Sequence, residues 1–192
     1  MKKQVFLILC VLFTSAALFS QELEAESKKD KKPLTLVLYS GYFGELISHP
    51  GLIAGADVTL FSSGKTDIAA GLQTGYYYHR LNSHGLFIQP LIRVQRTFSS
   101  GFFLDAALGA GYLHMIPDGK VYEVVDGKAA EVSNCGSPNF MPSFSLGAGY
   151  KFWQKTSIPL AVSLSTGIFG EYPFNTYMLP RVFVSLSCLY RL

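Results

Sequence analysis

Apolar and polar residues alternate along most of the chain from Leu34 to Leu192. The clearest case is the final segment, 181–192, where one set of alternate positions is apolar and the other mixes serines, apolar residues and two arginines. The apolar set is Val182, Val184, Leu186, Cys188, Tyr190 and Leu192. A period of two is that of a β-strand, whose side chains point alternately to its two sides. This segment is therefore predicted to be a strand with one apolar face.

Seven earlier segments alternate in the same way and are predicted to be strands. They are 34–43, 52–61, 67–78, 86–96, 102–113, 140–152 and 160–172. Each has ten or more residues, whereas a tilted strand needs about 9–11 residues to cross a membrane. An open sheet edge is not tolerated in hydrocarbon, so the first and last strands must pair. The pattern predicts an all-β fold, an eight-stranded antiparallel up-and-down transmembrane β-barrel with its apolar faces toward lipid.

The predicted connections fall into two sets. Those at 62–66, 97–101 and 153–157 are short, and those at 45–51, 79–85, 114–139 and 173–180 are longer. In bacterial outer-membrane barrels the periplasmic turns are short and the outer loops long. We therefore expect both termini to face the periplasm. The longest outer loop, 114–139, is the expected contact region, and Asp126-Gly127 predicts a small hairpin at 120–128 within it.

The N-terminal segment has the features of an export signal. Lys2 and Lys3 precede the apolar run Val5–Phe13, and small residues follow up to Ser20. The expected organisation is a signal peptide at 1–20, a charged flexible leader at 21–33 and the barrel at 34–192. No later run of about twenty apolar residues exists, which excludes a helical membrane protein.

Charge excludes a nucleic-acid partner. Of 16 basic residues the signal removes Lys2 and Lys3, which leaves 14 against 13 acidic residues, a net charge of +1. The two cysteines outside the signal, Cys135 and Cys188, fall at opposite ends of the predicted barrel, so we expect no disulfide between them.

Aromatic residues, 14% of the chain, gather near the predicted strand ends. Such residues form girdles at the two interfaces of a membrane barrel. The outer girdle is predicted to contain Tyr42, Tyr76, Tyr78, Tyr112, Phe140 and Tyr172, and the inner girdle Phe61, Phe98, Phe102, Phe152, Trp153 and Tyr190.

Several charged residues fall on the predicted inner face. Arg93 and Asp105 face each other across the hairpin around 97–101. The other expected barrel-interior charges are Asp57, Lys151, Glu171 and Arg191. An eight-stranded barrel has room for side chains and little else, so we expect these charges to pair and fill the interior. An ion path or gate is the alternative.

The residues that could bind a metal or catalyse a reaction form no established motif. His49, His79, His84 and His114 fall in or beside the outer loops and, with Glu45 and Glu171, could bind a divalent metal, yet no pair has the spacing of a known metal motif. Exposed loop histidines are the preferred interpretation. A lipid-modifying enzyme would need a serine beside a histidine base. In Ser48-His49 and Ser83-His84 the neighbours would point to opposite faces, so no catalytic, cofactor or metal site is expected.

The chain resembles the small eight-stranded outer-membrane barrels of the OmpA/OmpX-like group. The resemblance covers Leu34 to Leu192 and rests on the signal, the C-terminal strand and the two Gly-x-Gly-Tyr strand segments at 109–112 and 147–150. Members of that group usually end in an aromatic residue that the assembly machinery recognises, whereas this chain ends in Leu192.

The resemblance implies that the protein lies in the outer membrane of a double-membrane bacterium. Its expected partners are outer-membrane lipid and the barrel-assembly machinery. The protein is predicted to be a porin-like monomer with a structural, adhesive or surface-interaction role. The alternatives are a lipid-modifying outer-membrane enzyme and a soluble, lipocalin-like periplasmic carrier of apolar ligands, which would turn its apolar face inward.

Overall fold

The computed structural model describes residues 35–192, apart from 47, 81, 126 and 175. The predicted signal peptide at 1–20 and the leader at 21–33 lie outside the described residues. Among those described, no helix is long and apolar enough to cross a membrane.

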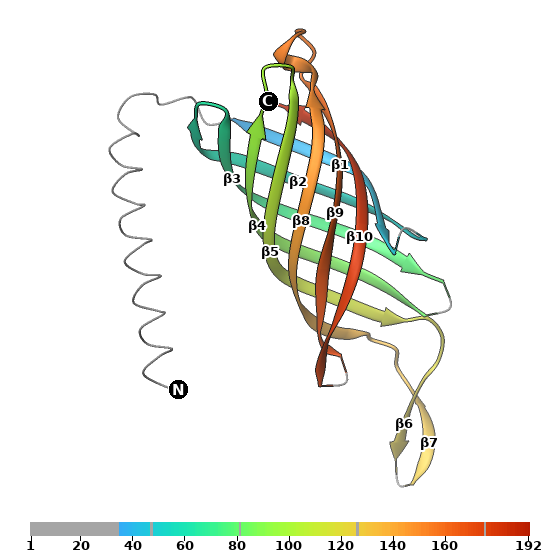
Figure 1. Ribbon diagram of the computed structural model, residues 1–192. Helices are drawn as coiled ribbons and strands as arrows, with labels where there is room; N and C mark the ends of the chain where they lie inside the picture. The colour runs from blue at the N-terminus through green and yellow to red at the C-terminus, as the bar shows by residue number, and fades with distance from the viewer. Residues whose placement is uncertain (1–34, 47, 81, 126, 175) are drawn as a thin grey trace, which may run out of the picture. The chain divides into compact units, whose positions relative to one another are not determined.

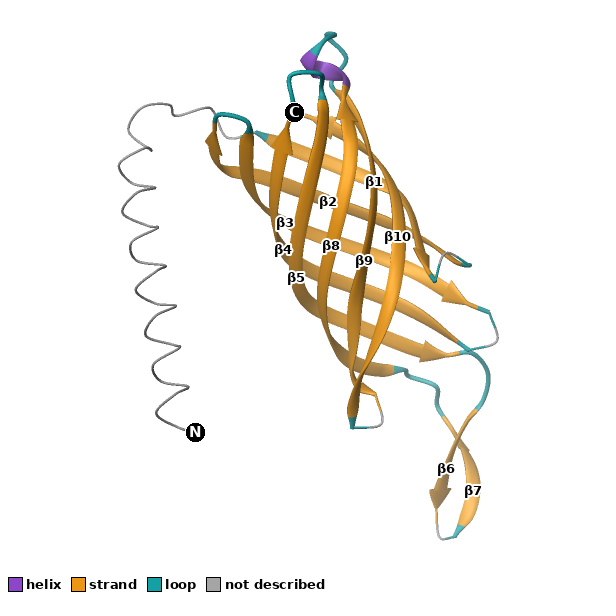
Figure 2. Cartoon of the chain, viewed as in Figure 1, coloured by secondary structure: helices purple, strands orange, loops and turns teal. Residues whose placement is uncertain are grey.

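Strands make up almost all of the described chain (Figures 1 and 2). The long strands are β1 (Leu36–Glu45), β2 (His49–Ser63), β3 (Thr66–His79), β4 (Ser83–Thr97), β5 (Phe102–Pro117), β8 (Ser137–Lys151), β9 (Leu160–Phe174) and β10 (Tyr177–Arg191). They form a closed antiparallel barrel in the order β1-β10-β9-β8-β5-β4-β3-β2. The predicted fold class is confirmed.

The first and last long strands close the barrel. β1 and β10 are antiparallel, with Val37 opposite Arg191 and Glu45 opposite Phe183. On its other side β1 pairs with β2 from Leu36 to Glu45. The closed ring therefore has no free sheet edge, which is the condition for a sheet surrounded by hydrocarbon.

The two ends of the barrel differ. At one end, here called the terminal end, lie the chain ends of β1 and β10 and the turns 64–65, 98–101 and 152–159, the last of which holds a short 3₁₀ helix, η1 (Phe152–Gln154). At the other, here called the hairpin end, the connection 118–136 carries β6 (Val121–Val125) and β7 (Lys128–Val132). These two strands form a separate antiparallel sheet that extends away from the barrel (Figure 1). The predicted small hairpin is present, but it extends to Val132 and does not end at Lys128 as predicted.

Three other connections at the hairpin end are shorter than predicted. Only residues 46–48, 80–82 and 175–176 separate the strands there, in place of the predicted loops 45–51, 79–85 and 173–180. Seven of the eight barrel strands have 14 to 16 residues, which at about 3.3 Å per residue exceeds what a tilted membrane crossing requires. The strands continue beyond the crossing and take up residues predicted as loop. The expected length asymmetry is thus wrong except at 118–136.

The outside of the barrel is apolar. Leu108, Leu146, Leu164 and Leu186 lie on four different strands with exposed fractions of 65%, 54%, 56% and 56%. A soluble carrier would bury these side chains around its ligand, so the lipocalin-like alternative is excluded. A continuous apolar exterior on a closed sheet is the arrangement of a transmembrane β-barrel.

Aromatic and aliphatic side chains fill the half of the lumen that is nearer the hairpin end. The buried cluster consists of Phe43, Ile53, Tyr77, Phe87, Leu113, Met115, Met141, Phe169 and Phe183. The Phe43 ring lies at its centre, with ring centroids 5.1 Å from Phe183 and 5.2 Å from Phe87. The sequence analysis predicts paired charges in the interior and does not predict this apolar layer.

Two glycines leave the space that buried rings occupy. A Cβ on Gly85 would lie 2.4 Å from Cε1 and Cζ of Tyr77, and a Cβ on Gly75 would lie 2.4 Å from Cζ of Phe87. Both rings are fully buried. Each ring therefore lies directly against the backbone of a neighbouring strand.

We expect Gly85→Ala to lower the free energy of unfolding by about 1–3 kcal/mol, because the added methyl group overlaps the Tyr77 ring, which is fully buried. Urea unfolding of the refolded barrel in lipid vesicles measures this change. The same substitution in a Tyr77→Ala background is expected to cost much less. Equal costs in the two backgrounds would show that contact with the ring is not the cause.

Candidate functional site

A buried guanidinium joins two carboxylates in the lumen. Arg93, on β4, donates from Nε to Asp57 Oδ2 and from Nη1 to Asp105 Oδ1, each at 2.8 Å. Its guanidinium also lies 5.7 Å from the Tyr39 ring centroid. Each carboxylate has a second oxygen without a hydrogen-bond partner among the described residues, Asp57 Oδ1 and Asp105 Oδ2. The three side chains therefore fill this part of the lumen with one charge pair and one additional negative charge.

Lys151 lies nearer the terminal end. Its Nζ donates to Thr97 Oγ1 at 3.0 Å and is 3.7 Å from Asp67 Oδ2. Arg191, also predicted inside, is the last residue of β10 and is exposed at the terminal end. A strand's final residue lies at the rim, where alternation no longer decides whether a side chain meets water.

A second charge network lies toward the hairpin end. Arg181 Nη2 is 2.7 Å from Glu171 Oε2, and Arg181 Nη1 is 3.1 Å from Glu45 Oε1. Glu45 is only 1% exposed, although it was predicted in a loop. Along β1, Tyr39 contacts the Arg93 network, Phe43 belongs to the apolar cluster and Glu45 belongs to this network. The lumen is therefore layered as polar, apolar and polar.

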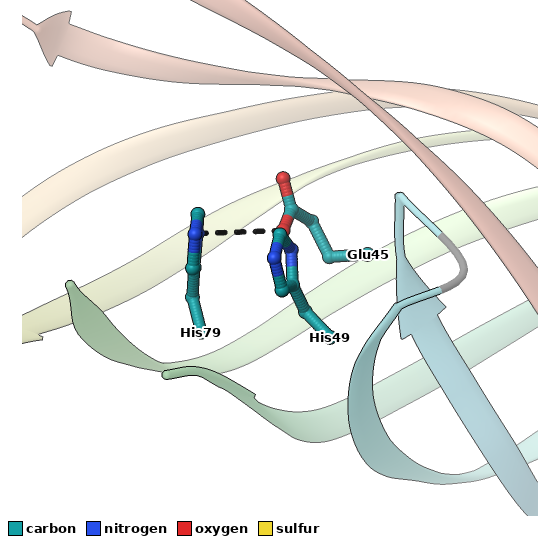
Figure 3. Close-up of side chains that lie close together, drawn as sticks. All are labelled: Glu45, His49 and His79. Atoms are coloured by element: carbon teal, nitrogen blue, oxygen red, sulfur yellow. Dashed lines mark hydrogen bonds and ion pairs between the residues drawn. The ribbon is translucent and has the colours of Figure 1, made fainter. Parts of the chain in front are cut away.

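Two histidines join Glu45 at the barrel mouth (Figure 3). His49 Nδ1 contacts Glu45 Oε2, and His79 Nδ1 is 3.9 Å from the same oxygen. The two imidazole rings are stacked, with centroids 3.5 Å apart and an interplanar angle of 19°. His49 is the first residue of β2 and His79 the last of β3, so both lie in strands and not in the predicted exposed loops.

The other two histidines lie apart from this group. His84 Nδ1 is 2.6 Å from Tyr76 Oη, and its ring also stacks on Tyr78. His114 Nδ1 is 2.8 Å from Tyr112 Oη, and its Nε2 is 2.9 Å from the Cys135 carbonyl. Of the four histidines treated together in the sequence, the structure thus brings only His49 and His79 to one carboxylate.

The predicted girdle residues mostly face outward. Tyr42, Tyr76, Tyr112 and Tyr172 are exposed toward the hairpin end, and Phe152 and Tyr190 toward the terminal end, whereas Tyr78 and Trp153 are half-buried. Exposed aromatic side chains among the predicted girdle residues thus lie toward both ends of the barrel. Among the described residues, Cys135 and Cys188 are the two cysteines, and both are exposed and free.

The serine–histidine neighbours have no catalytic geometry. Ser83 is buried, and its Oγ has no hydrogen-bond partner among the described residues, whereas the adjacent His84 pairs with Tyr76. Ser48 is exposed, and the adjacent His49 turns inward to Glu45. A nucleophile and its base must lie within hydrogen-bond reach, a condition that neither neighbouring pair meets.

The closed sheet, the apolar exterior and the filled lumen define a small transmembrane β-barrel. No protein-family model matches the sequence, and comparison with curated proteins gives no match. Three solved barrels of similar structure are the N-terminal domain of Pseudomonas aeruginosa OprF, Neisserial surface protein A and the outer-membrane enzyme PagL. They are 12%, 8% and 14% identical, with TM-scores of 0.48, 0.47 and 0.48.

The structural matches cover 82%, 83% and 81% of this chain and 97%, 96% and 98% of the respective solved chains. The class of this protein follows from its own strand order and from the side chains on the two faces of the sheet.

Proposed function

We propose that the protein is an outer-membrane barrel that anchors a surface contact element, the β6–β7 hairpin. The observation that carries the proposal is the contrast between a filled lumen and an exposed hairpin that extends beyond the barrel (Figure 1). A lumen occupied by a nine-residue apolar cluster supports a structural anchor better than a pore.

The hairpin has the features of a contact surface. Tyr122 and Val124 are 57% and 79% exposed, and they lie two residues apart on β6, so they share a face. The sheet has only two strands, which leaves both outer edges able to pair with an added strand. Lys120 and Glu131 pair at 2.7 Å near its base. The expected partner is a protein or matrix component with an apolar patch or an available strand.

Trypsin treatment of intact cells tests the orientation. If the hairpin end faces outward, trypsin is expected to cut at the exposed Lys120 and Lys128 without access to the periplasm. The exposed Lys155, in the turn 152–159 at the terminal end, provides an internal control. It should be cut only after the outer membrane is permeabilised. Cutting at Lys155 in intact cells, with the hairpin protected, would reverse the proposed orientation.

A paired variant tests the contact role. Tyr122→Ser/Val124→Ser is expected to reduce adhesion of cells that display the protein, while the purified barrel still shifts its gel migration on boiling. Leu86→Ser/Ile88→Ser on the lipid-facing side of β4 is the matched control, and it should lower barrel stability instead. Unchanged adhesion of cells displaying the hairpin variant at equal surface amounts would contradict the proposed role.

A further inference from the structure

The three side chains at the barrel mouth form a row across three strands. Glu45 on β1 is the cross-strand partner of His49 on β2. His79 lies on β3, two residues beyond Tyr77, which is opposite Gly51 of β2. These positions are fixed by sheet pairing and not by loop conformation. Among the residues that the structure describes, Glu45, His49 and His79 form a group whose possible ligand atoms all lie within 4.8 Å of one another.

The neighbouring charges favour a cation at this place. Arg181 is shared between Glu45 and Glu171, so two carboxylates meet one guanidinium and one negative charge remains. Arg181 binds Oε1 of Glu45, which leaves Oε2 directed toward the histidines. In metal sites, a carboxylate ligand is typically oriented by a hydrogen bond to its other oxygen, and Arg181 makes such a contact with Glu45 Oε1.

The donor set fits a divalent transition metal. Zinc binds imidazole nitrogen at about 2.0–2.1 Å and carboxylate oxygen at about 2.0–2.2 Å, so two ligand atoms in a tetrahedral site lie roughly 3.4 Å apart. His79 Nδ1 and Glu45 Oε2 are 3.9 Å apart, which is close to that spacing. The two stacked imidazole rings would turn out of parallel on binding, so that both Nδ1 lone pairs point at one ion. His49 and His79 have side-chain exposures of 17% and 27%, which leaves the site open to solvent.

We propose that Glu45, His49 and His79 bind one divalent transition-metal ion, such as Zn²⁺, at the hairpin-end mouth of the barrel. Two imidazoles and one carboxylate supply three ligands, and the fourth position is open to water or to a ligand from outside. The ion would connect β1, β2 and β3 above the apolar layer of the lumen.

Titration of the purified full-length protein with Zn²⁺ in detergent micelles tests the proposal. A Cys10→Ser/Cys135→Ser/Cys188→Ser background removes all three thiols of the full-length chain, because thiolates also bind zinc. We expect one equivalent of Zn²⁺ to bind, and His79→Gln to weaken binding by at least about tenfold. His84→Gln, at the same end of the barrel but hydrogen-bonded to Tyr76, is the matched control and should leave the affinity unchanged.

Heat-dependent gel migration shows whether each variant is folded. Equal zinc affinity in the parent and folded His79→Gln protein would overturn the proposal, as would an equal loss in His84→Gln. A measurement that needs no ligand variant is the electron paramagnetic resonance spectrum of the Cu²⁺-loaded protein. Two coordinated nitrogens are expected, and a spectrum with none or one would overturn the proposed ligand set.

Discussion

Replacement of Arg93 by leucine is expected to lower the free energy of unfolding by about 3–5 kcal/mol, because it leaves Asp57 and Asp105 buried without their shared partner. Each carboxylate is 2.8 Å from the guanidinium, and neither remaining oxygen has another partner among the described residues. Urea unfolding in lipid vesicles measures the change, with fluorescence of the single tryptophan, Trp153, as the signal.

The exposed pair Lys120–Glu131 supplies the control. Its two side chains are 66% and 51% exposed, and a pair in water contributes about 0–1 kcal/mol. Lys120→Leu should therefore leave the unfolding midpoint almost unchanged. If Arg93→Leu costs no more than Lys120→Leu, the lumen around Arg93 must be hydrated enough to solvate both carboxylates, and the account of a closed interior fails.

Arginine in place of Leu108 is expected to cost about 2–4 kcal/mol, which is the range for a cation at the middle of a lipid-facing strand. Leu108 lies near the middle of β5, and its side chain is 65% exposed. In water an exposed leucine-to-arginine change would have little effect. The size of the loss therefore reports whether this surface meets lipid.

Leu160→Arg is the matched control for depth. Leu160 is exposed as well, but it is the first residue of β9, at the terminal end. Near the interface the cost falls to about 0–1 kcal/mol. Reversible unfolding in vesicles gives both values. Similar small costs at the two positions would be incompatible with a membrane-spanning barrel.

The barrel was predictable because lipid imposes one simple rule on every strand. Alternate positions such as Leu164 and Leu186 must be apolar whatever their neighbours are, so the strands could be located one at a time. The strand ends were harder. Pro50-Gly51 and Gly85 resemble loop residues, yet they lie in β2 and β4, because the sheet continues beyond the zone where alternation is enforced.

The contacts inside the barrel depend on which strands are neighbours, and the alternating pattern does not show which strands are neighbours. Arg93 and Asp105 belong to one hairpin, so their pairing could be predicted from β4 and β5 alone. Asp57 comes from β2, and Arg181 reaches Glu45 across 136 positions in the sequence. The aromatic cluster likewise combines single rings from many strands. The row of Glu45, His49 and His79 is not visible in the sequence, because the loops 45–51 and 79–85 are predicted separately.

Because β1 pairs with β10, insertion into the membrane and folding of the barrel depend on each other. The partner of the first barrel strand is the last barrel strand along the chain, so a sheet without β10 exposes the hydrogen-bonding groups of β1 and β9. Hydrocarbon does not tolerate unpaired backbone groups, so a sheet that lacks β10 is not stable in the bilayer. Insertion and ring closure must therefore finish together, and loss of β10 would remove the whole fold and not one-eighth of it.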